Sequence, residues 1–161
     1  MRQRCRPLVA SGSLWIATER EFACAHNLQV NSNSMTRKAY TSETGALPIG
    51  SYSSAVEAGG LVFLAGQTPR DRDNVRHGDK PFAVQARMTM DNLEAAANAA
   101  GLSLKDAVRV GVFLRNPADS KEFDAIYREY VSEPFPARTL TQSNLVGFDI
   151  EVDAVLLAKR G

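Results

Sequence analysis

The sequence predicts a two-layer α+β domain in which two helices cover one face of a mixed six-stranded sheet. Strand-like alternation accounts for six segments and helical periodicity for two, in the order three strands, helix, strand, helix, two strands. Two helices cannot cover both faces of such a sheet. Because the second face would carry apolar residues, we expect other copies of the chain to bury it.

The first three strands are expected to form an antiparallel meander. Gly59 and Gly60 are a hairpin signal between the second and third strands. Gly66 follows the apolar run of the third strand, at a point where a backbone could approach a ligand closely. The three predicted strands are residues 37–41, 48–58 and 61–65.

Two segments have the periodicity of helices. The first has Asp79 as its expected N-cap, runs to Ala100 and stops at Gly101. The second is expected to begin near Asp119, which has Glu122 at capping-box spacing. Its apolar positions recur every three or four residues, as Phe123, Ile126, Tyr127, Tyr130 and Val131.

The remaining strands are predicted at residues 106–114, 136–141 and 148–156. In the last of them, apolar residues alternate with Asp149, Glu151 and Asp153, so the three carboxylates share one face. Arg138 lies just upstream, in a segment expected to pair with the last strand as a hairpin. Arg138 and Glu151 are therefore predicted to face one small site. The alternative is an ion pair of Arg138 with Glu151 or Asp153 that bridges subunits.

Composition excludes several kinds of chemistry from the body of the chain. The formal net charge of +1 provides no basic stripe for nucleic acid. Cys5 and Cys24 both precede residue 35, so the body has no thiolate nucleophile and no cysteine-based metal site. His26 also lies there, which leaves His77 alone in a charged segment, where we expect it to be solvated. No metal and no cofactor are predicted.

Residues 1–34 are predicted to be an extension of a single α+β domain at residues 35–161. Their four arginines and two glutamates give a charge of +2, which leaves −1 for the rest. Their apolar stretch, residues 7–17, is shorter than the roughly 20 residues that a membrane span needs. We expect an upstream start or a disordered extension, with organellar targeting as the alternative. The domain itself is expected in the cytoplasm.

The predicted elements carry short motifs whose order and spacing are specific. They are Gly50-Ser51-Tyr52-Ser53, Leu61-Val62-Phe63-Leu64-Ala65-Gly66-Gln67, Asn92-Leu93, Ala99-Ala100-Gly101, Val112-Phe113-Leu114, Phe135-Pro136-Ala137-Arg138 and Ile150-Glu151-Val152. Together these motifs, spread over residues 38–159, resemble the Rid (YjgF) family of reactive-intermediate deaminases.

The resemblance implies a chorismate-mutase-like homotrimer with three ligand sites in the clefts between subunits. By position, it implies that Arg138 binds the substrate carboxylate and that Glu151 positions water. It further implies that Tyr52 lines the cleft and that Gly66 borders it. The chain departs from the family pattern near this site, at Ser51 where proline is usual, Ala65 where serine is common and Leu140 where many members have cysteine.

The implied activity is hydrolysis of reactive 2-imino or 2-enamino acids to a 2-oxo acid and ammonia, a form of metabolite damage control. This activity would make the chain similar to 2-iminobutanoate/2-iminopropanoate deaminases. Such a reaction needs orientation and a water rather than a metal or a nucleophile, because the iminium carbon is already electrophilic. The departures leave the substrate open, including an aminomuconate or aminoacrylate. The alternative function is a non-catalytic trimer that binds small carboxylates through Arg138.

Overall fold

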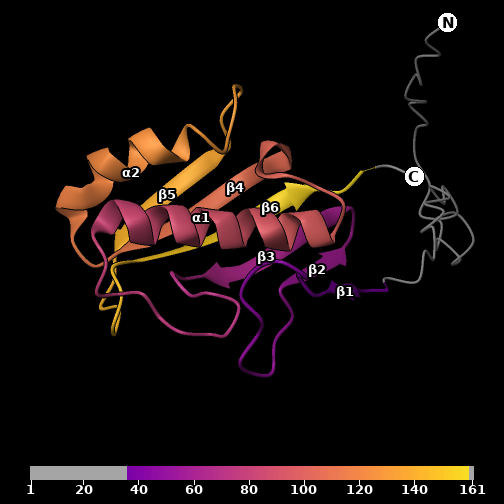
Figure 1. Ribbon diagram of the computed structural model, residues 1–161. Helices are drawn as coiled ribbons and strands as arrows, with labels where there is room; N and C mark the ends of the chain where they lie inside the picture. Colours follow the sequence, from indigo (N-terminus) through magenta and orange to yellow (C-terminus); the bar gives the residue numbers. More distant parts are fainter. Residues whose placement is uncertain (1–35, 160–161) are drawn as a thin grey trace, which may run out of the picture. The chain divides into compact units, whose positions relative to one another are not determined.

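The computed structural model describes residues 36–159, so the extension predicted at residues 1–34 lies outside the described residues (Figure 1). Six strands and two α-helices follow one another along this part of the chain. They are β1 (Lys38–Tyr40), β2 (Ala55–Ala58), β3 (Leu61–Gln67), α1 (Phe82–Ala99), β4 (Ala107–Leu114), α2 (Ser120–Tyr127), β5 (Ala137–Gln142) and β6 (Ile150–Leu157). The predicted number and order of elements are confirmed.

The six strands form one mixed sheet in the order β1-β2-β3-β6-β4-β5. Strands β1 to β3 form the predicted meander, and Gly59 and Gly60 turn the β2–β3 hairpin with positive φ angles of 60° and 79°. Side chains from both helices and from the sheet share one apolar core. Figure 1 shows α1 lying across the sheet. The two-layer arrangement, with both helices on one face, follows from that shared core.

The hairpin predicted between the last two strands does not form. Strand β5 pairs in parallel with β4, with Arg138 opposite Val110, whereas β6 lies between β3 and β4. The reason is the connection through α2. A helix between two strands forms a crossover that brings the second strand back parallel to the first. As a result, β5 lies at the edge of the sheet and β6 at its centre.

The alternation predicted for the last strand is confirmed from Ile150 onward. Its core-facing side chains are 0–1% exposed, and they are Ile150, Val152, Ala154 and Leu156. Asp149 precedes the strand, and its carboxylate accepts a hydrogen bond from Gln85 in the helix layer, so the prediction that it shares a face with Glu151 and Asp153 is wrong. At the start of β4, Val108 is 44% exposed because the register with β6 shifts between Ala107 and Arg109. On the face without helices, Phe63 and Leu157 are 46% and 58% exposed, which gives that face an apolar surface.

Helix α1 is preceded by Pro81 as its N-cap residue rather than by the predicted Asp79. Helix α2 begins where predicted, with Asp119 as its N-cap residue, but the Asp119 side chain makes no capping hydrogen bond. Before α2, Asn116 caps a 3₁₀ turn at Pro117–Asp119 by accepting a hydrogen bond from the backbone N–H of Ala118 at 3.1 Å. Proline fits the first turn of such a helix because its missing N–H would have no partner there.

Gln85 of α1 joins the helix layer to the start of β6. Its side chain is fully buried and its Nε2 donates to the carbonyl oxygen of Lys80 at 2.8 Å and to Oδ2 of Asp149 at 2.7 Å. Its Oε1 accepts from the backbone N–H of Asp149 at 2.9 Å. These bonds fix where β6 enters the sheet, since Asp149 immediately precedes it.

The substitution Gln85→Leu is expected to lower the free energy of unfolding by about 2–3 kcal/mol, because it leaves buried donors and acceptors without partners. Chemical denaturation of both proteins measures the change. The matched control is Gln142→Leu on the exposed edge strand β5, which should change stability by less than about 0.5 kcal/mol. Equal effects of the two substitutions would contradict this role for Gln85.

Candidate functional site

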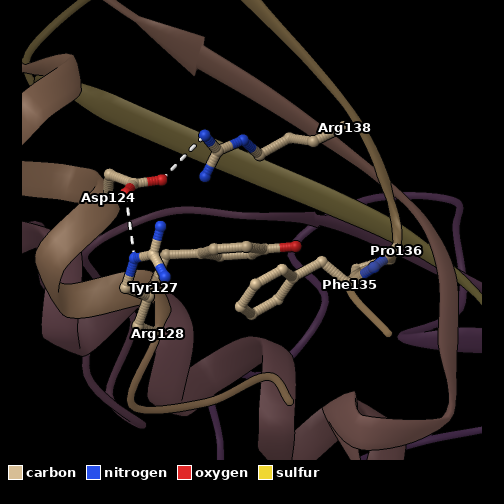
Figure 2. Close-up of a pocket in the computed structure, with 6 residues that line it drawn as sticks. All are labelled: Asp124, Tyr127, Arg128, Phe135, Pro136 and Arg138. Atoms are coloured by element: carbon tan, nitrogen blue, oxygen red, sulfur yellow. Dashed lines mark hydrogen bonds and ion pairs between the residues drawn. The ribbon is translucent and has the colours of Figure 1, made fainter. Parts of the chain in front are cut away.

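Arg138 lies in a pocket of about 300 Å³ between β5 and α2 (Figure 2). Its Nη2 is 2.8 Å from Oδ1 of Asp124, and its guanidinium lies 4.8 Å from the centre of the Tyr127 ring. Asp124 also accepts a hydrogen bond from Nε of Arg128 at 3.1 Å. The lining residues are Asp124, Tyr127, Arg128, Phe135, Pro136 and Arg138. A carboxylate entering this pocket would meet two arginines and compete with Asp124 for them.

The Arg138 pocket contains two arginines and one carboxylate, that of Asp124. Hydrogen bonds from Arg138 and then from Arg128 lower the pKa of Asp124, so this carboxyl stays ionised at neutral pH. The Tyr127 hydroxyl is buried and has no hydrogen-bond partner within residues 36–159. Burial raises the pKa of Tyr127, so this hydroxyl keeps its proton and remains available as a donor.

Glu151 lies in a second pocket, of about 380 Å³, which also contains Tyr52 and Gly66. Gly66 provides the space for the carboxylate, since a Cβ at residue 66 would overlap Oε1 of Glu151. Any larger residue would displace the Glu151 side chain from the strand surface. The structure therefore brings together three of the four site residues that the resemblance implied. The pocket is lined by Ile49, Tyr52, Ala65, Gly66, Thr68, Arg70, Arg76, Phe148 and Glu151.

The environment of Glu151 raises its pKa. Burial contributes most, and the neighbouring carboxylate of Asp153 adds to it, while Arg70 and Arg76 act in the opposite direction. The sequence left open an ion pair of Arg138 with Glu151 or Asp153 that bridges subunits. Within the chain, Arg138 pairs with Asp124, and Asp153 pairs with Arg109 at 3.1 Å, so a pair between subunits stays a prediction. A carboxyl with a raised pKa can exchange protons closer to neutral pH.

Within one chain, Arg138 and Glu151 point to opposite faces of the sheet. Arg138 is in register with Val110, which is buried in the core on the helix side. Glu151 is in register with Phe113, three residues further along β4, and therefore faces the other way. Strand β4 also separates the two strands, which adds roughly 10 Å sideways. The prediction that both side chains face one site of a single chain is therefore wrong.

Asp124, Tyr127, Arg70 and Arg76 were not predicted as site residues. Tyr127 was assigned to the apolar side of a helix, and nothing in the helical pattern showed that it and Asp124 face Arg138. Arg70 and Arg76 belong to the charged loop after Gly66, to which no role in the site was assigned. Only the position of this loop, directly after the Gly66 segment that was expected to lie near a ligand, could have indicated them.

His77 lies in the same loop, and its Nε2 is 2.9 Å from Oδ2 of Asp71, within hydrogen-bond distance. This contact, first through the hydrogen bond, lowers the pKa of Asp71. Among residues 36–159, no three histidine, cysteine, aspartate or glutamate side chains lie close enough to hold a metal ion. Neither helix in that range combines the length and the apolar character that a membrane span requires.

Comparison with known proteins agrees with the fold. The family model described as Endoribonuclease L-PSP matches residues 43–159. A RutC family protein of Pyrococcus horikoshii is 35% identical over 115 residues, which cover 70% of this chain and 91% of the relative. The 2-iminobutanoate/2-iminopropanoate deaminase of Dermatophagoides farinae is 36% identical over 95 residues, 57% of this chain and 72% of that protein.

Among solved structures, RidA from an Antarctic Psychrobacter bacterium superposes with a TM-score of 0.69 at 28% sequence identity. The match covers 74% of this chain and 98% of the RidA chain. The family model, matched over residues 43–159, includes the strands that carry the two pockets. The chain therefore belongs to the endoribonuclease L-PSP family, the Rid (YjgF) family that its motifs resemble.

Proposed function

We propose that the chain is a cytoplasmic homotrimeric deaminase that hydrolyses reactive 2-imino and 2-enamino acids to 2-oxo acids and ammonia. The observation that carries the proposal is the position of Arg138 and Glu151 on opposite faces of one sheet. A group that binds a carboxylate and a group that handles protons become one site only when a second copy supplies one of them. Membership of a family that includes a named imine deaminase supports the same reaction.

The surfaces needed for such an assembly are available. Strand β5 is an edge of the sheet and carries Arg138, while the face that carries Glu151 also exposes Phe63 and Leu157. A copy that packs its β5 edge over this face would bury the apolar side chains and bring its Arg138 toward the Glu151 pocket. Edge and face are different surfaces, so the contact is heterologous, and three such contacts close a cyclic trimer.

In the proposed reaction, Arg138 of one copy holds the substrate carboxylate with its forked guanidinium. The carboxylate takes the place of Asp124, which occupies that guanidinium in the described chain. Water then adds to the electrophilic imine carbon and loses a proton to Glu151. From the carbinolamine that forms in this way from the protonated imine, Glu151 returns this proton to the nitrogen. The C–N bond then breaks as the hydroxyl group becomes the C=O group, ammonia leaves, and the hydroxyl proton passes to the ionised Glu151. The raised pKa of Glu151 suits a group that must both accept and donate a proton.

Tyr52 and Gly66 have supporting roles in this proposal. Gly66 keeps the strand surface open so that Glu151 can lie across it. The Tyr52 hydroxyl accepts a hydrogen bond from Nη2 of Arg70 at 3.4 Å, which directs the ring toward the pocket. Because Tyr52 is 44% exposed, it is available to cover a bound substrate.

A second candidate function is capture of small carboxylates without turnover. The Arg138 pocket favours it, because two arginines and the Tyr127 hydroxyl meet there without any contribution from Glu151. Binding would then depend on Arg138 and be indifferent to Glu151, whereas hydrolysis depends on both residues.

The substitution Arg138→Ala is expected to lower kcat/KM for imine hydrolysis about 100-fold, since it removes charge-assisted hydrogen bonds to the substrate carboxylate. Imines are generated in situ by an amino-acid oxidase, and what survives is trapped with semicarbazide. The matched control is Arg87→Ala, which also removes an exposed arginine paired with a carboxylate, that of Glu129, and should leave turnover unchanged. Absence of turnover by the wild-type protein, with tight binding of 2-oxo acids, would favour the second candidate function.

A mixture of two inactive variants should recover activity. Homotrimers of Arg138→Ala and of Glu151→Gln each lack one group at every site. In trimers assembled from equal amounts of both, about one interface in four combines an intact Arg138 with an intact Glu151, if subunits mix at random. Co-refolding the two variants and measuring imine hydrolysis tests this arrangement. If the mixture stays as inactive as its components, the two residues do not meet across an interface.

The pH dependence should follow the neighbours of Glu151. As a proton acceptor Glu151 must be ionised, so kcat/KM falls as the pH drops through its raised pKa. The substitution Asp153→Asn removes a negative charge that raises the pKa of Glu151, so the acid limb should move to lower pH. The control is Glu122→Gln on the exposed side of α2, whose profile should match that of the wild type. Unchanged profiles in both variants would show that another group controls the acid limb.

A further inference from the structure

Two arginines of one small loop project into the Glu151 pocket. Arg70 and Arg76 lie opposite each other in an isolated antiparallel bridge, and Asn74 turns the loop between them with a φ of 64°. Asn92 of α1 holds the start of this loop, because its Nδ2 donates to the carbonyl oxygens of Thr68 at 3.1 Å and Arg70 at 2.7 Å. The loop is therefore fixed to the helix layer, and both arginines have defined positions.

Arg70 is 6% exposed, and its hydrogen bonds all go to neutral acceptors. They run to Oγ1 of Thr68 at 3.1 Å, Oδ1 of Asn74 at 3.2 Å and the hydroxyl of Tyr52 at 3.4 Å. No carboxylate of residues 36–159 forms an ion pair with it. A guanidinium has five N–H donors, so two remain for a ligand. A buried cation without an anionic partner is costly, and an anion in the pocket would relieve that cost.

Arg76 adds a second positive charge on the same pocket. Its Nη1 donates to the carbonyl oxygen of Val146 at 3.2 Å, and its guanidinium lies 5.0 Å from the centre of the Phe148 ring. Within the described range Arg76 also has no carboxylate partner. Glu151 is thus the one acidic residue among those that line this pocket, and it faces two guanidinium groups.

The pocket consequently has more cationic groups than the proposed reaction uses. That reaction needs one arginine for the substrate's α-carboxylate, and Arg138 of a second copy supplies it. Two further arginines beside the water-handling carboxylate fit a second anionic group on the same substrate. The pocket volume of about 380 Å³ is enough for a short chain that carries one.

We infer that the preferred substrate is a dicarboxylic 2-imino acid whose side-chain carboxylate is bound by Arg70 and Arg76. This inference rests on the proposed function, since it names the substrate class of the same site. The α-carboxylate binds Arg138 of the second copy, and the imine carbon faces Glu151. The side-chain carboxylate compensates the positive charges of Arg70 and Arg76. Hydrolysis itself proceeds as described above and consumes one water for each ammonia released.

The test compares two imines of equal chain length that differ in one carboxylate, 2-iminoglutarate and 2-iminopentanoate. Amino-acid oxidases generate them from glutamate and norvaline. The wild-type protein should hydrolyse 2-iminoglutarate with a kcat/KM at least tenfold higher. The substitution Arg76→Gln should remove most of that preference, by lowering the ratio of kcat/KM for 2-iminoglutarate to kcat/KM for 2-iminopentanoate about tenfold.

Arg76 is chosen first because it is exposed, so its replacement should leave the fold intact. Arg70→Lys is the second variant. It keeps the buried positive charge but loses the planar guanidinium with its paired N–H donors, so it should also reduce the preference for 2-iminoglutarate. The matched control is Arg72→Gln, which removes the same charge from the exposed tip of the same loop. The control should keep the wild-type preference, which excludes a general effect of net charge.

Two outcomes separate the inference from the function on which it rests. Equal hydrolysis of both imines by the wild type, unchanged in Arg76→Gln and Arg70→Lys, would overturn the dicarboxylate inference and leave the deaminase intact. If neither imine is hydrolysed, the deaminase fails, and calorimetry with 2-oxoglutarate and 2-oxopentanoate then decides the pocket's preference alone. Tighter binding of 2-oxoglutarate that is lost in Arg76→Gln supports the arginine site, and equal binding overturns it.

Discussion

The central position of β6 is the constraint on which the rest of the structure depends. This strand pairs with β3 on one side and β4 on the other, and its inward side chains form the middle of the core. Its outward side chains must therefore project from the opposite face, away from the helices. Glu151 lies on that face because Ile150 and Val152 are in the core. The location of the acidic group thus follows from the packing of its apolar neighbours.

The parallel crossover through α2 has the complementary effect on Arg138. It returns the chain to the edge of the sheet, where the side chain of Arg138 projects toward α2 and pairs with Asp124. The two groups needed for a deaminase are consequently separated by the sheet itself. The β5 edge carries Arg138 and the face without helices carries Glu151, so the two surfaces are complementary in charge. In the proposed enzyme, association of two copies therefore also completes the site.

Electrostatic balance distinguishes the two pockets. In the Arg138 pocket, Asp124 already compensates the arginines, so a substrate carboxylate exchanges one ion pair for another. In the Glu151 pocket, Arg70 and Arg76 have no acidic partner within the described residues apart from the half-buried Glu151 they face. The first pocket thus suits reversible capture of a common carboxylate, and the second suits discrimination among side chains. Gly66 leaves room for the Glu151 carboxylate in this second pocket. Proton transfer by Glu151 and discrimination among substrate side chains can therefore occur in the same pocket.

The sequence by itself determined the elements and the face that each side chain takes, because periodicities of 2 and 3.6 are local properties of the backbone. The alternation of Ile150 to Leu156 and the Gly59-Gly60 turn were predicted for that reason. Only the tertiary structure decided which strands pair, because pairing depends on the crossover through α2. This strand pairing separated Arg138 from Glu151 and placed Arg138 beside Asp124. It also brought the loop of Arg70 and Arg76 over Glu151, through contacts between residues some 80 positions apart.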